Sequence, residues 1–362
     1  MKQGTCRRFL WGGRRVLSAR TVMLVTMFLT SPTAAGHQDV VRIAGSAWIG
    51  DAPTWVADRE GLFNLDRPDD APVIEVEMHG SGLEALGQLL GGEADFALAA
   101  TTPTALGLMG VLDDHGPGSA SLVVLGSVAL SNQSHYLVAP ARHGIRSARD
   151  LSGRRVGVMF GTSSHYGWSR FSAFHELDHA DVELVDTPVT GMAEGLRQGQ
   201  LEAAVIWQPW DLALRESLDE PITVLPMRMI YTVNWLLLSS REFVAERPDV
   251  VERVLRGYLG AMDMIDAQPN RTLAHHAAAT GRDESELASQ AEAMLWRLSL
   301  NWSVLVNLGT QFEWLASWPE HEGLAVPEPS RYLHATSLRN VAPELVTLPD
   351  YLLTVQQQDV HP

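Results

Sequence analysis

A strand–helix–strand unit occurs twice in this sequence, and the two copies lie 107 residues apart. The first copy contains Leu-Leu-Gly-Gly-Glu-Ala-Asp-Phe-Ala-Leu at 89–98, and the second contains Leu-Arg-Gln-Gly-Gln-Leu-Glu-Ala-Ala-Val at 196–205. In each copy a helical segment ends at a glycine and a short apolar, strand-like run follows. A spacing of about a hundred residues is too long for a solenoid repeat and suits two similar lobes. We therefore expect an α/β chain with two lobes, each with a parallel-rich sheet covered by helices.

Two extended apolar segments with polar interruptions bracket the second copy. The segment 122–138 is interrupted by Ser-Asn-Gln-Ser-His, and the segment 222–240 contains Ile-Tyr-Thr-Val-Asn-Trp. This arrangement predicts that the chain enters the second lobe and returns, which makes a two-segment hinge. A ligand cleft would then lie between the lobes, at the carboxyl ends of the parallel strands. The predicted domains are 36–130 with 232–362 as lobe one, and 131–231 as lobe two.

The part of lobe one after residue 240 has a helical pattern. Apolar residues recur at helical spacing from Val250 to Met262, after a helix start at Pro248. Further helices are predicted at 283–298 and 301–318, so lobe one ends in a helical C-terminal tail. The tryptophans of these helices are interpreted as packing residues, and no chemistry is predicted in the tail.

The first 35 residues have the pattern of an export signal. Basic residues precede an apolar run at 22–29, and small residues at Thr33 and Ala35 allow cleavage before Gly36. The run is too short to span a bilayer comfortably. Cys6 precedes the run, so it cannot be the modified cysteine of a lipoprotein. General-secretory and twin-arginine export both remain open.

Charge and cysteine usage exclude several classes of function. The formal net charge is −16, whereas nucleic-acid binding needs a basic face. Because Cys6 is the only cysteine, the predicted mature chain has no disulfide, thiol nucleophile or cysteine-ligated metal. His175 and His179 have the i, i+4 spacing of a metal pair but lack an evident third ligand. We therefore predict no metal and no cofactor.

The segment 156–168, Val-Gly-Val-Met-Phe-Gly-Thr-Ser-Ser-His-Tyr-Gly-Trp, combines a strand, a glycine turn and the expected start of a helix near Tyr166. Its hydroxyl residues fit two interpretations. They can cap a helix, as Ser and Thr commonly do. They can also point hydroxyls and free backbone N–H groups at an anionic or strongly polar ligand atom. The position of this segment in a repeated unit facing the cleft favours ligand contact.

Six short motifs occur in order between residues 40 and 240. They are Ile-Gly-Asp-Ala-Pro at 49–53, Gly-Leu-Phe at 61–63, Gly-Glu-Ala-Asp-Phe-Ala at 92–97, Leu-Ser-Gly-Arg-Arg-Val-Gly-Val at 151–158, Gly-Gln-Leu-Glu-Ala-Ala at 199–204 and Trp-Gln-Pro-Trp at 207–210. With these motifs the chain resembles the periplasmic solute-binding proteins of bacterial ABC importers, in the nitrate/taurine/aliphatic-sulfonate branch. The resemblance implies the type II periplasmic-binding-protein fold, a periplasmic location, closure of two lobes on one small molecule, and delivery to an ABC permease.

The resemblance also implies which residues line the cleft. The implied ligand-binding residues are Ser46, Trp48, Ser81, Thr101, Thr102, Asn132, Thr162, Ser163, Ser164, His165, Trp207 and Gln208, with Thr190 as a further loop residue. Core packing is the alternative role for Trp48 and Trp207, and a solvent-facing position is the alternative for His165. Many relatives carry Glu where this chain has Gln208, and the lost carboxylate favours an anionic or neutral ligand. No Arg or Lys stands in these loops, so hydroxyls and helix N-terminal N–H groups are expected to hold a sulfonate-type or other oxyanion ligand.

Two other functions use the same fold. A pyrimidine-precursor synthase would need a cysteine- and histidine-rich iron-site motif, which counts against an enzyme in a mature chain without cysteine. A ligand-sensing partner of a membrane receptor would use the same cleft as a transport protein. We predict a monomeric binding protein with a small-molecule ligand and a permease partner, and no enzymatic activity.

Overall fold

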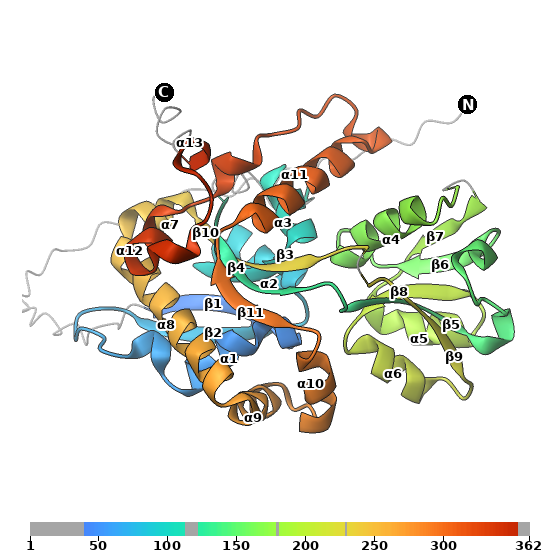
Figure 1. The fold of residues 1–362 in the computed structure, drawn as a ribbon, viewed down its shortest axis with the longest axis horizontal. Helices are drawn as coiled ribbons and strands as arrows, with labels where there is room; N and C mark the ends of the chain where they lie inside the picture. Colours follow the sequence, from blue (N-terminus) through green and yellow to red (C-terminus); the bar gives the residue numbers. More distant parts are fainter. Residues whose placement is uncertain (1–39, 113–121, 179–180, 229, 354–362) are drawn as a thin grey trace, which may run out of the picture. The chain divides into compact units, whose positions relative to one another are not determined.

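The chain is organised around two separate β-sheets, which we describe from a computed structural model (Figure 1). The structure describes residues 40–112, 122–178, 181–228 and 230–353, and all of them belong to one unit, Gln38–Pro362. The predicted export signal at 1–35, including Cys6, and His179 lie outside the described residues. Among the helices of the described segments, none combines the length and the apolar character needed to cross a membrane.

Sheet A has six strands in the order β11-β4-β10-β3-β1-β2. Strand β1 pairs in parallel with both β2 and β3, whereas β10 runs antiparallel to both β3 and β4. Its strands are β1 Val40–Ser46, β2 Val73–His79, β3 Phe96–Ala100, β4 Leu122–Ser131, β10 Val233–Ser240 and β11 Leu295–Ser299.

Sheet B has five strands in the order β7-β6-β8-β5-β9. Strand β6 pairs in parallel with β7 and β8, and β5 runs antiparallel to β8 and β9. Its strands are β5 His135–Pro140, β6 Arg155–Val158, β7 Glu183–Asp186, β8 Ala203–Trp207 and β9 Ile222–Pro226.

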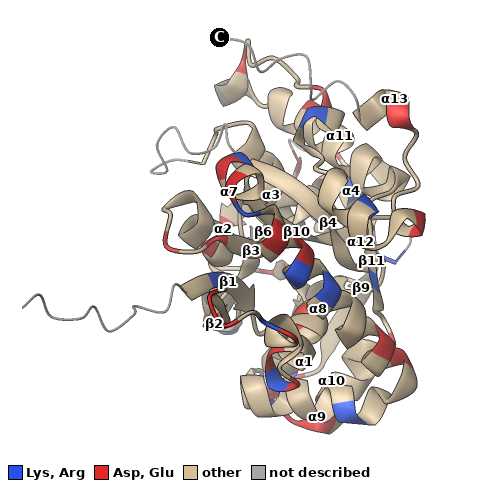
Figure 2. Ribbon diagram, turned by 90° about the vertical axis from the view of Figure 1, so that its left-hand side faces the viewer, with Lys and Arg blue, Asp and Glu red and all other residues tan. Residues whose placement is uncertain are grey.

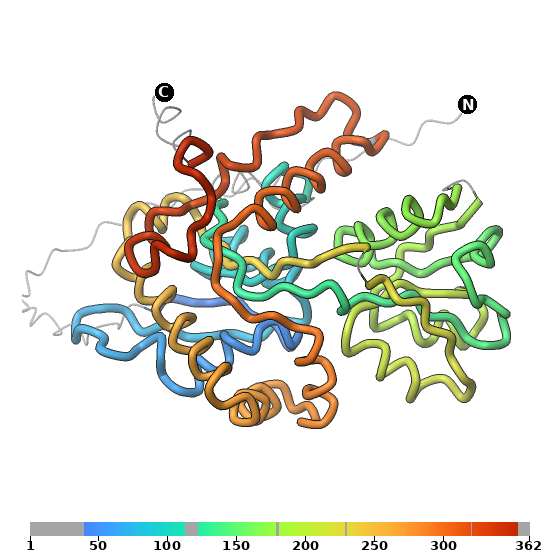
Figure 3. Tube along the Cα trace, viewed as in Figure 1, coloured from blue at the N-terminus to red at the C-terminus, as the bar shows by residue number. Residues whose placement is uncertain are grey.

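Five strands of sheet A, in the order β2-β1-β3-β10-β4, match the order and directions of sheet B, β7-β6-β8-β5-β9. In both, three parallel strands are followed by one reversed strand, and only the edge strand β11 has no counterpart in sheet B. The reversed strand of each sheet is the first strand after the chain has crossed from the other sheet: β5 follows β4, and β10 follows β9. Figure 3 shows both connections between the sheets, one green and one yellow. Both sheets are therefore mixed, while the predicted double crossover is confirmed.

The sequence repeat corresponds to equivalent strands of the two sheets. Strands β3 and β8 occupy the same positions in the two copies, at the 107-residue offset. The glycines before them have the same left-handed backbone, with φ of 75° at Gly92 and 71° at Gly199. Successive side chains of β8 point to opposite faces of the sheet, and helices cover both faces, so both sets of side chains are buried. Val205 packs into a core with helix α4, and Ile206 into a core with helices α5 and α6.

Thirteen α-helices cover the sheets in the described part of the chain (Figures 1 and 2). They are α1 Ala52–Arg59, α2 Gly82–Leu90, α3 Thr101–Leu108, α4 Ser163–Phe174, α5 Met192–Arg197, α6 Trp210–Ser217, α7 Arg241–Glu246, α8 Pro248–Ala267, α9 Pro269–Thr280, α10 Glu284–Ala291, α11 Trp302–Ala316, α12 Thr336–Val341 and α13 Asp350–Leu353. In the view of Figure 2, basic and acidic positions are interspersed along an otherwise uncharged ribbon.

Two predicted elements are wrong in detail. The predicted helix 283–298 is a short helix, α10, followed by strand β11, which pairs with β4 at the edge of sheet A. Pairing with a strand that lies far away in the sequence overrides the local helical pattern here. Helix α4 begins at Ser163 instead of near Tyr166, because the turn at Gly161 and Thr162 already completes the loop.

Candidate ligand-binding site

A pocket with a volume of about 70 Å³ lies where strands of both sheets end. Sheet A contributes the loops after β1 and β2 and the start of β10, and sheet B contributes the start of β5, the end of β8 and the start of α4. In open α/β sheets, ligands bind in such crevices at strand ends. A cavity of this size holds several water molecules, which corresponds to a compact ligand.

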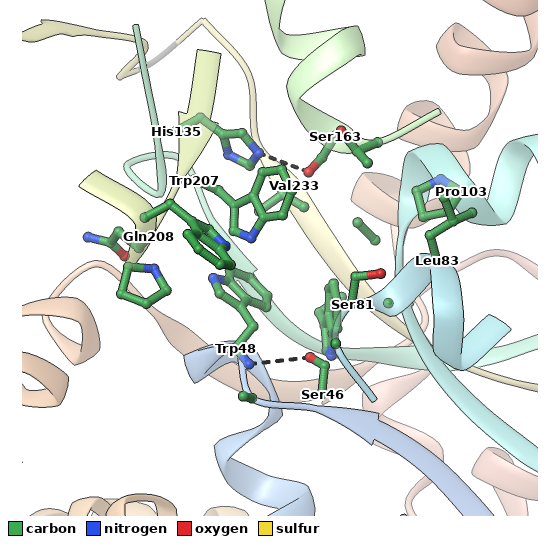
Figure 4. A pocket seen from close by; sticks show the side chains of 18 of the residues that line it. Ser46, Trp48, Ser81, Leu83, Pro103, His135, Ser163, Trp207, Gln208 and Val233 are labelled. Atoms are coloured by element: carbon green, nitrogen blue, oxygen red, sulfur yellow. Dashed lines mark hydrogen bonds between the residues drawn. The ribbon is translucent and has the colours of Figure 1, made fainter. Parts of the chain in front are cut away.

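The structure brings seven of the predicted ligand-binding residues together at this pocket. They are Ser46, Trp48, Ser81, Thr162, Ser163, Trp207 and Gln208. Figure 4 shows Trp48 and Trp207 projecting into the pocket from opposite sheets. A contact of these residues with a ligand stays a prediction.

Five predicted residues, and Thr190, are not part of the pocket lining. Successive residues of a helix point about 100° apart, so Ser163 at the start of α4 faces the pocket while the next two residues turn inward. Ser164 is fully buried. His165 is stacked on Phe160, with ring centroids 4.2 Å apart, and neither faces solvent nor lines the pocket.

The same argument applies to the two threonines at the start of α3. Thr101 and Thr102 are fully buried, and the Thr101 hydroxyl donates to the carbonyl of Asn234 at 3.3 Å. Asn132 lies in the connection between β4 and β5, partly exposed and outside the lining. Thr190 lies in the short 3₁₀ turn Val189–Gly191, away from this pocket.

Four polar or aromatic residues of the lining were missed by sequence reasoning: His135, Trp210, Trp235 and Arg282. His135 and Trp235 belong to the segments predicted as hinges, so their position could have been inferred. Arg282 follows α9 in the tail, where no chemistry was predicted, and no local pattern marks it. It corrects the expectation that the pocket has no cation.

Four indoles form much of the pocket wall: Trp48, Trp207, Trp210 and Trp235. Trp48 and Trp235 are in contact, with ring centroids 4.7 Å apart at an angle of 57°. Two glycines make room for these rings. A Cβ at Gly50 would lie 1.9 Å from Cζ3 of Trp48, and one at Gly82 would lie 2.5 Å from Cη2 of Trp235.

Asp51 lies behind this wall, fully buried, and fixes two of its residues. Its carboxylate accepts hydrogen bonds from the Ser46 backbone N–H at 2.5 Å, the Ser46 hydroxyl at 2.7 Å and the Trp235 indole Nε1 at 2.6 Å. Burial raises the pKa of Asp51 to about 7, although these three donors act in the opposite direction.

His135 is held by hydroxyls on both sides of its ring. Its Nε2 lies 2.9 Å from Ser163 Oγ (Figure 4), and its Nδ1 lies 3.0 Å from Ser134 Oγ. Burial lowers the pKa of His135 to about 3, so the ring is neutral at physiological pH. Ser163 therefore meets the pocket with its hydroxyl coupled to a neutral imidazole.

Arg282 is the only Arg, Lys, Asp or Glu among the described residues that line the pocket. Its guanidinium is half-buried, and burial lowers its pKa, with Glu286 acting in the opposite direction. Arginine remains protonated in proteins, so it contributes a full positive charge. The formal charge of the lining is thus positive.

Two buried polar atoms of the lining have no hydrogen-bond partner among the described residues, namely Trp48 Nε1 and Gln208 Oε1. The other amide atom of Gln208, Nε2, donates to the Tyr136 hydroxyl at 2.9 Å. Either amide orientation leaves one atom of Gln208 free for a ligand. In the described segments, no group of three or more His, Cys, Asp or Glu is placed to hold a metal ion.

Two mixed sheets linked by a double crossover, with a pocket between their strand ends, define the fold of periplasmic binding proteins. The chain belongs to the NMT1-like family, whose sequence model matches residues 34–280. That range contains both copies of the repeated unit and ends just before Arg282. The predicted resemblance to solute-binding proteins of the nitrate and sulfonate branch is confirmed.

Solved structures support the fold assignment. The alkanesulfonate-binding protein SsuA of Xanthomonas axonopodis pv. citri, bound to MOPS, has a TM-score of 0.67 and 17% identity, over 83% of this chain and 100% of that chain. The periplasmic nitrate-binding protein NrtA of Synechocystis PCC 6803 has a TM-score of 0.62 and 13% identity, over 88% of this chain and 91% of that chain. At these identities the similarity establishes the fold alone.

A curated relative matches this chain over most of its own length. This protein of Brucella abortus (strain 2308), which is named a putative binding protein, is 24% identical over 284 residues, which cover 76% of this chain and 83% of the relative.

Proposed function

We propose that this protein is an exported solute-binding protein that captures a compact organic anion, such as a sulfonate or carboxylate, and delivers it to an ABC permease. The observation that carries the proposal is Arg282, a single positive charge in a pocket otherwise lined by indoles, hydroxyls and neutral groups. A guanidinium matches the geometry of sulfonate and carboxylate oxygens.

The polar groups around the pocket suit the same head group. Ser163 is the first residue of a twelve-residue helix, whose N-terminus favours negative charge. Ser81 also lines the pocket, and its hydroxyl accepts from the Glu84 backbone N–H, which leaves its own proton for a ligand. The hydroxyls of Ser46 and Thr162 donate instead to Asp51 and to the Met159 carbonyl. Ser81, Ser163 and Arg282 would together replace the water around an anion.

The indoles refine the ligand class. Nitrate or sulfate offers no apolar surface to bury. A ligand with a hydrocarbon chain or ring on its anionic group gains binding free energy by burying that part against the four tryptophans. The similar SsuA structure was solved with MOPS, and the NrtA structure is that of a nitrate-binding protein. Between these two kinds of ligand, the wall of this pocket favours the organic one.

The export and transport parts of the proposal are supported by the sequence and the family. The basic and apolar pattern of residues 1–35 is that of a secretion signal. The similar solved structures include two proteins described as periplasmic binding proteins and one described as the ligand-binding component of an ABC-type import system. We propose a periplasmic location, a permease partner and binding of the ligand without chemical conversion.

Calorimetry on the purified protein tests the ligand class. The panel is ethanesulfonate, benzenesulfonate, propionate, nitrate and choline, preceded by mass spectrometry of any ligand released on denaturation. We expect binding of at least one organic anion, weaker binding of nitrate and none of choline. Binding of choline or of an uncharged compound, with no organic anion bound, would refute the proposal.

A further inference from the structure

His135 lies where the chain has just crossed from sheet A to sheet B, and it also lines the pocket. It is the first residue of β5, it pairs with Trp207 of β8, and it lines the pocket beside Ser163. Its side chain is 6% exposed, and the ring of Tyr231 packs against it edge-on with centroids 5.6 Å apart. Both ring nitrogens are therefore limited to the two serine hydroxyls that face them.

A neutral imidazole has one nitrogen that donates and one that accepts a hydrogen bond. Because each nitrogen of His135 faces a hydroxyl, the tautomer decides the direction of both hydrogen bonds. With the proton on Nδ1, the ring donates to Ser134 and Ser163 must donate its own proton to Nε2. With the proton on Nε2, the ring donates to Ser163, and the Ser163 proton is free for the pocket.

We propose that Ser134, His135 and Ser163 form an uncharged relay that directs the Ser163 hydroxyl proton at an anionic ligand. In the complex, Ser134 donates to Nδ1, Nε2–H donates to Ser163 Oγ, and Ser163 donates to an oxygen of the ligand. The inference rests on the proposed function, since an anion offers only acceptors. His135 is then a positioning residue, because it acts through Ser163.

In the opposite tautomer, with the proton on Nδ1, Ser163 would donate its proton to His135 Nε2. A serine that donates to a histidine nitrogen is the arrangement of a nucleophile and its base. A base needs a pKa near the working pH, whereas burial lowers that of His135 to about 3. The burial that makes the ring a poor base also keeps it neutral, and a neutral ring is what the relay requires.

The relay and Arg282 would contribute two different kinds of hydrogen-bond donor to the ligand. Arg282 donates whatever the ligand is, since its guanidinium has no acceptor. Ser163 donates only when the ring holds its proton on Nε2, so a ligand oxygen at Ser163 stabilises that tautomer.

Nitrogen-15 NMR of the histidine side chains of the full chain measures the tautomer directly, with ethanesulfonate and benzenesulfonate as probes. The signal of His135 is assigned by its loss in His135→Phe. We expect the Nε2–H tautomer of His135 in the saturated complex. His334, a half-buried histidine whose Nε2 faces Ser337 Oγ at 3.0 Å, is outside the pocket lining and should not respond to the ligand.

Two serine variants complete the test. Ser163→Ala should lower sulfonate affinity by about five- to tenfold, the effect of one hydrogen bond, and should abolish the tautomer preference induced by the ligand. Ser134→Ala should weaken that preference and leave the pocket lining unchanged. An Nδ1–H tautomer or a protonated ring in the sulfonate complex would overturn the relay. Absence of anion binding by the wild type in calorimetry would overturn the proposed function instead.

Discussion

The Asp51 carboxylate accepts a hydrogen bond from the indole Nε1 of Trp235 at 2.6 Å, across 184 residues of sequence. Asp51 lies after β1, while Trp235 lies on β10, the strand that enters sheet A after the chain returns from sheet B. The bond joins the loop that carries Ser46 and Trp48 to the returning segment. The position of Trp235 in the pocket wall therefore depends on the same hydrogen bond that attaches the returning strand β10 to the loop after β1.

Replacement of Asp51 tests this coupling. Asp51→Asn keeps the size of the side chain, but its amide NH₂ cannot accept from the Ser46 donors. We expect a loss of about 1–3 kcal/mol in the free energy of unfolding and weaker binding of organic anions. Urea unfolding and calorimetry measure the two effects. Asp58→Asn, on the outer part of α1, is the matched control, and an equal loss in both variants would contradict the coupling.

The pH dependence of stability gives a second test of Asp51. The native state keeps a proton on this carboxyl up to a pKa of about 7, whereas an unfolded aspartate loses it near 3.8. Raising the pH between these values therefore lowers stability, by at most about 4 kcal/mol from this group. The difference in unfolding free energy between wild type and Asp51→Asn should shrink from pH 5 to pH 8. A difference that is constant with pH would show that Asp51 stays ionised throughout.

Arg282 should dominate the affinity for anions. Arg282→Gln removes the positive charge from the lining while keeping donors, and we expect organic-anion affinity to fall by about ten- to a hundredfold. The control is Arg256→Gln, an exposed arginine outside the pocket lining that pairs with Glu252 on its own helix. Calorimetry at two salt concentrations separates the charge effect from packing. Equal affinities of the two variants would exclude Arg282 from recognition.

Gln208 lines the pocket with a neutral amide. Gln208→Glu introduces a buried negative charge beside the pocket, and we expect anion affinity to fall by about tenfold or more. Gln200→Glu, in an exposed turn, adds the same charge away from the pocket. A gain of affinity for a cationic ligand in Gln208→Glu would fit the same electrostatic reason. An unchanged anion affinity would count against a role for this side chain.

The tryptophans should bind the body of the ligand. Trp207→Ala should cost about 2 kcal/mol or more of binding free energy, typical of a buried aromatic contact. The loss should be larger for benzenesulfonate than for ethanesulfonate, because a ring buries more area against indoles. Trp302→Ala, whose side chain is 49% exposed on α11, serves as the control. An equal loss of binding free energy for both sulfonates would show that Trp207 does not contact the apolar part of the ligand.

Much of the fold could be predicted from local patterns. The repeat at Gly92 and Gly199 identified equivalent strands, because the turn glycines and the apolar runs are local signals. Helix α2 also begins at a local signal, because Ser81 precedes it and its hydroxyl accepts from the Glu84 backbone N–H at 3.2 Å. The polar interruptions of the apolar segments located both crossings between the sheets.

Positions that depend on distant contacts were missed. Strand β11 has a helical local pattern and is a strand because β4 offers it a free edge. Arg282 reaches the pocket through the path of the chain after α9, which no motif encodes. His165 belongs to an aromatic cluster with Trp314 and Trp318 of the tail, so its neighbours lie about 150 residues away in the sequence.

Each sheet contains one strand, β5 or β10, that is made only after the chain has crossed from the other sheet. This arrangement sets the order in which the two sheets can be completed during synthesis. Once Pro226 has emerged, all five strands of sheet B are present. Sheet A at that stage has β1 to β4 but an open gap between β3 and β4, since β10 ends only at Ser240. The sheet made first in sequence is thus the one completed last. Its inner strand edges at β3 and β4 therefore stay unpaired until β10 has been made, while sheet B can already form.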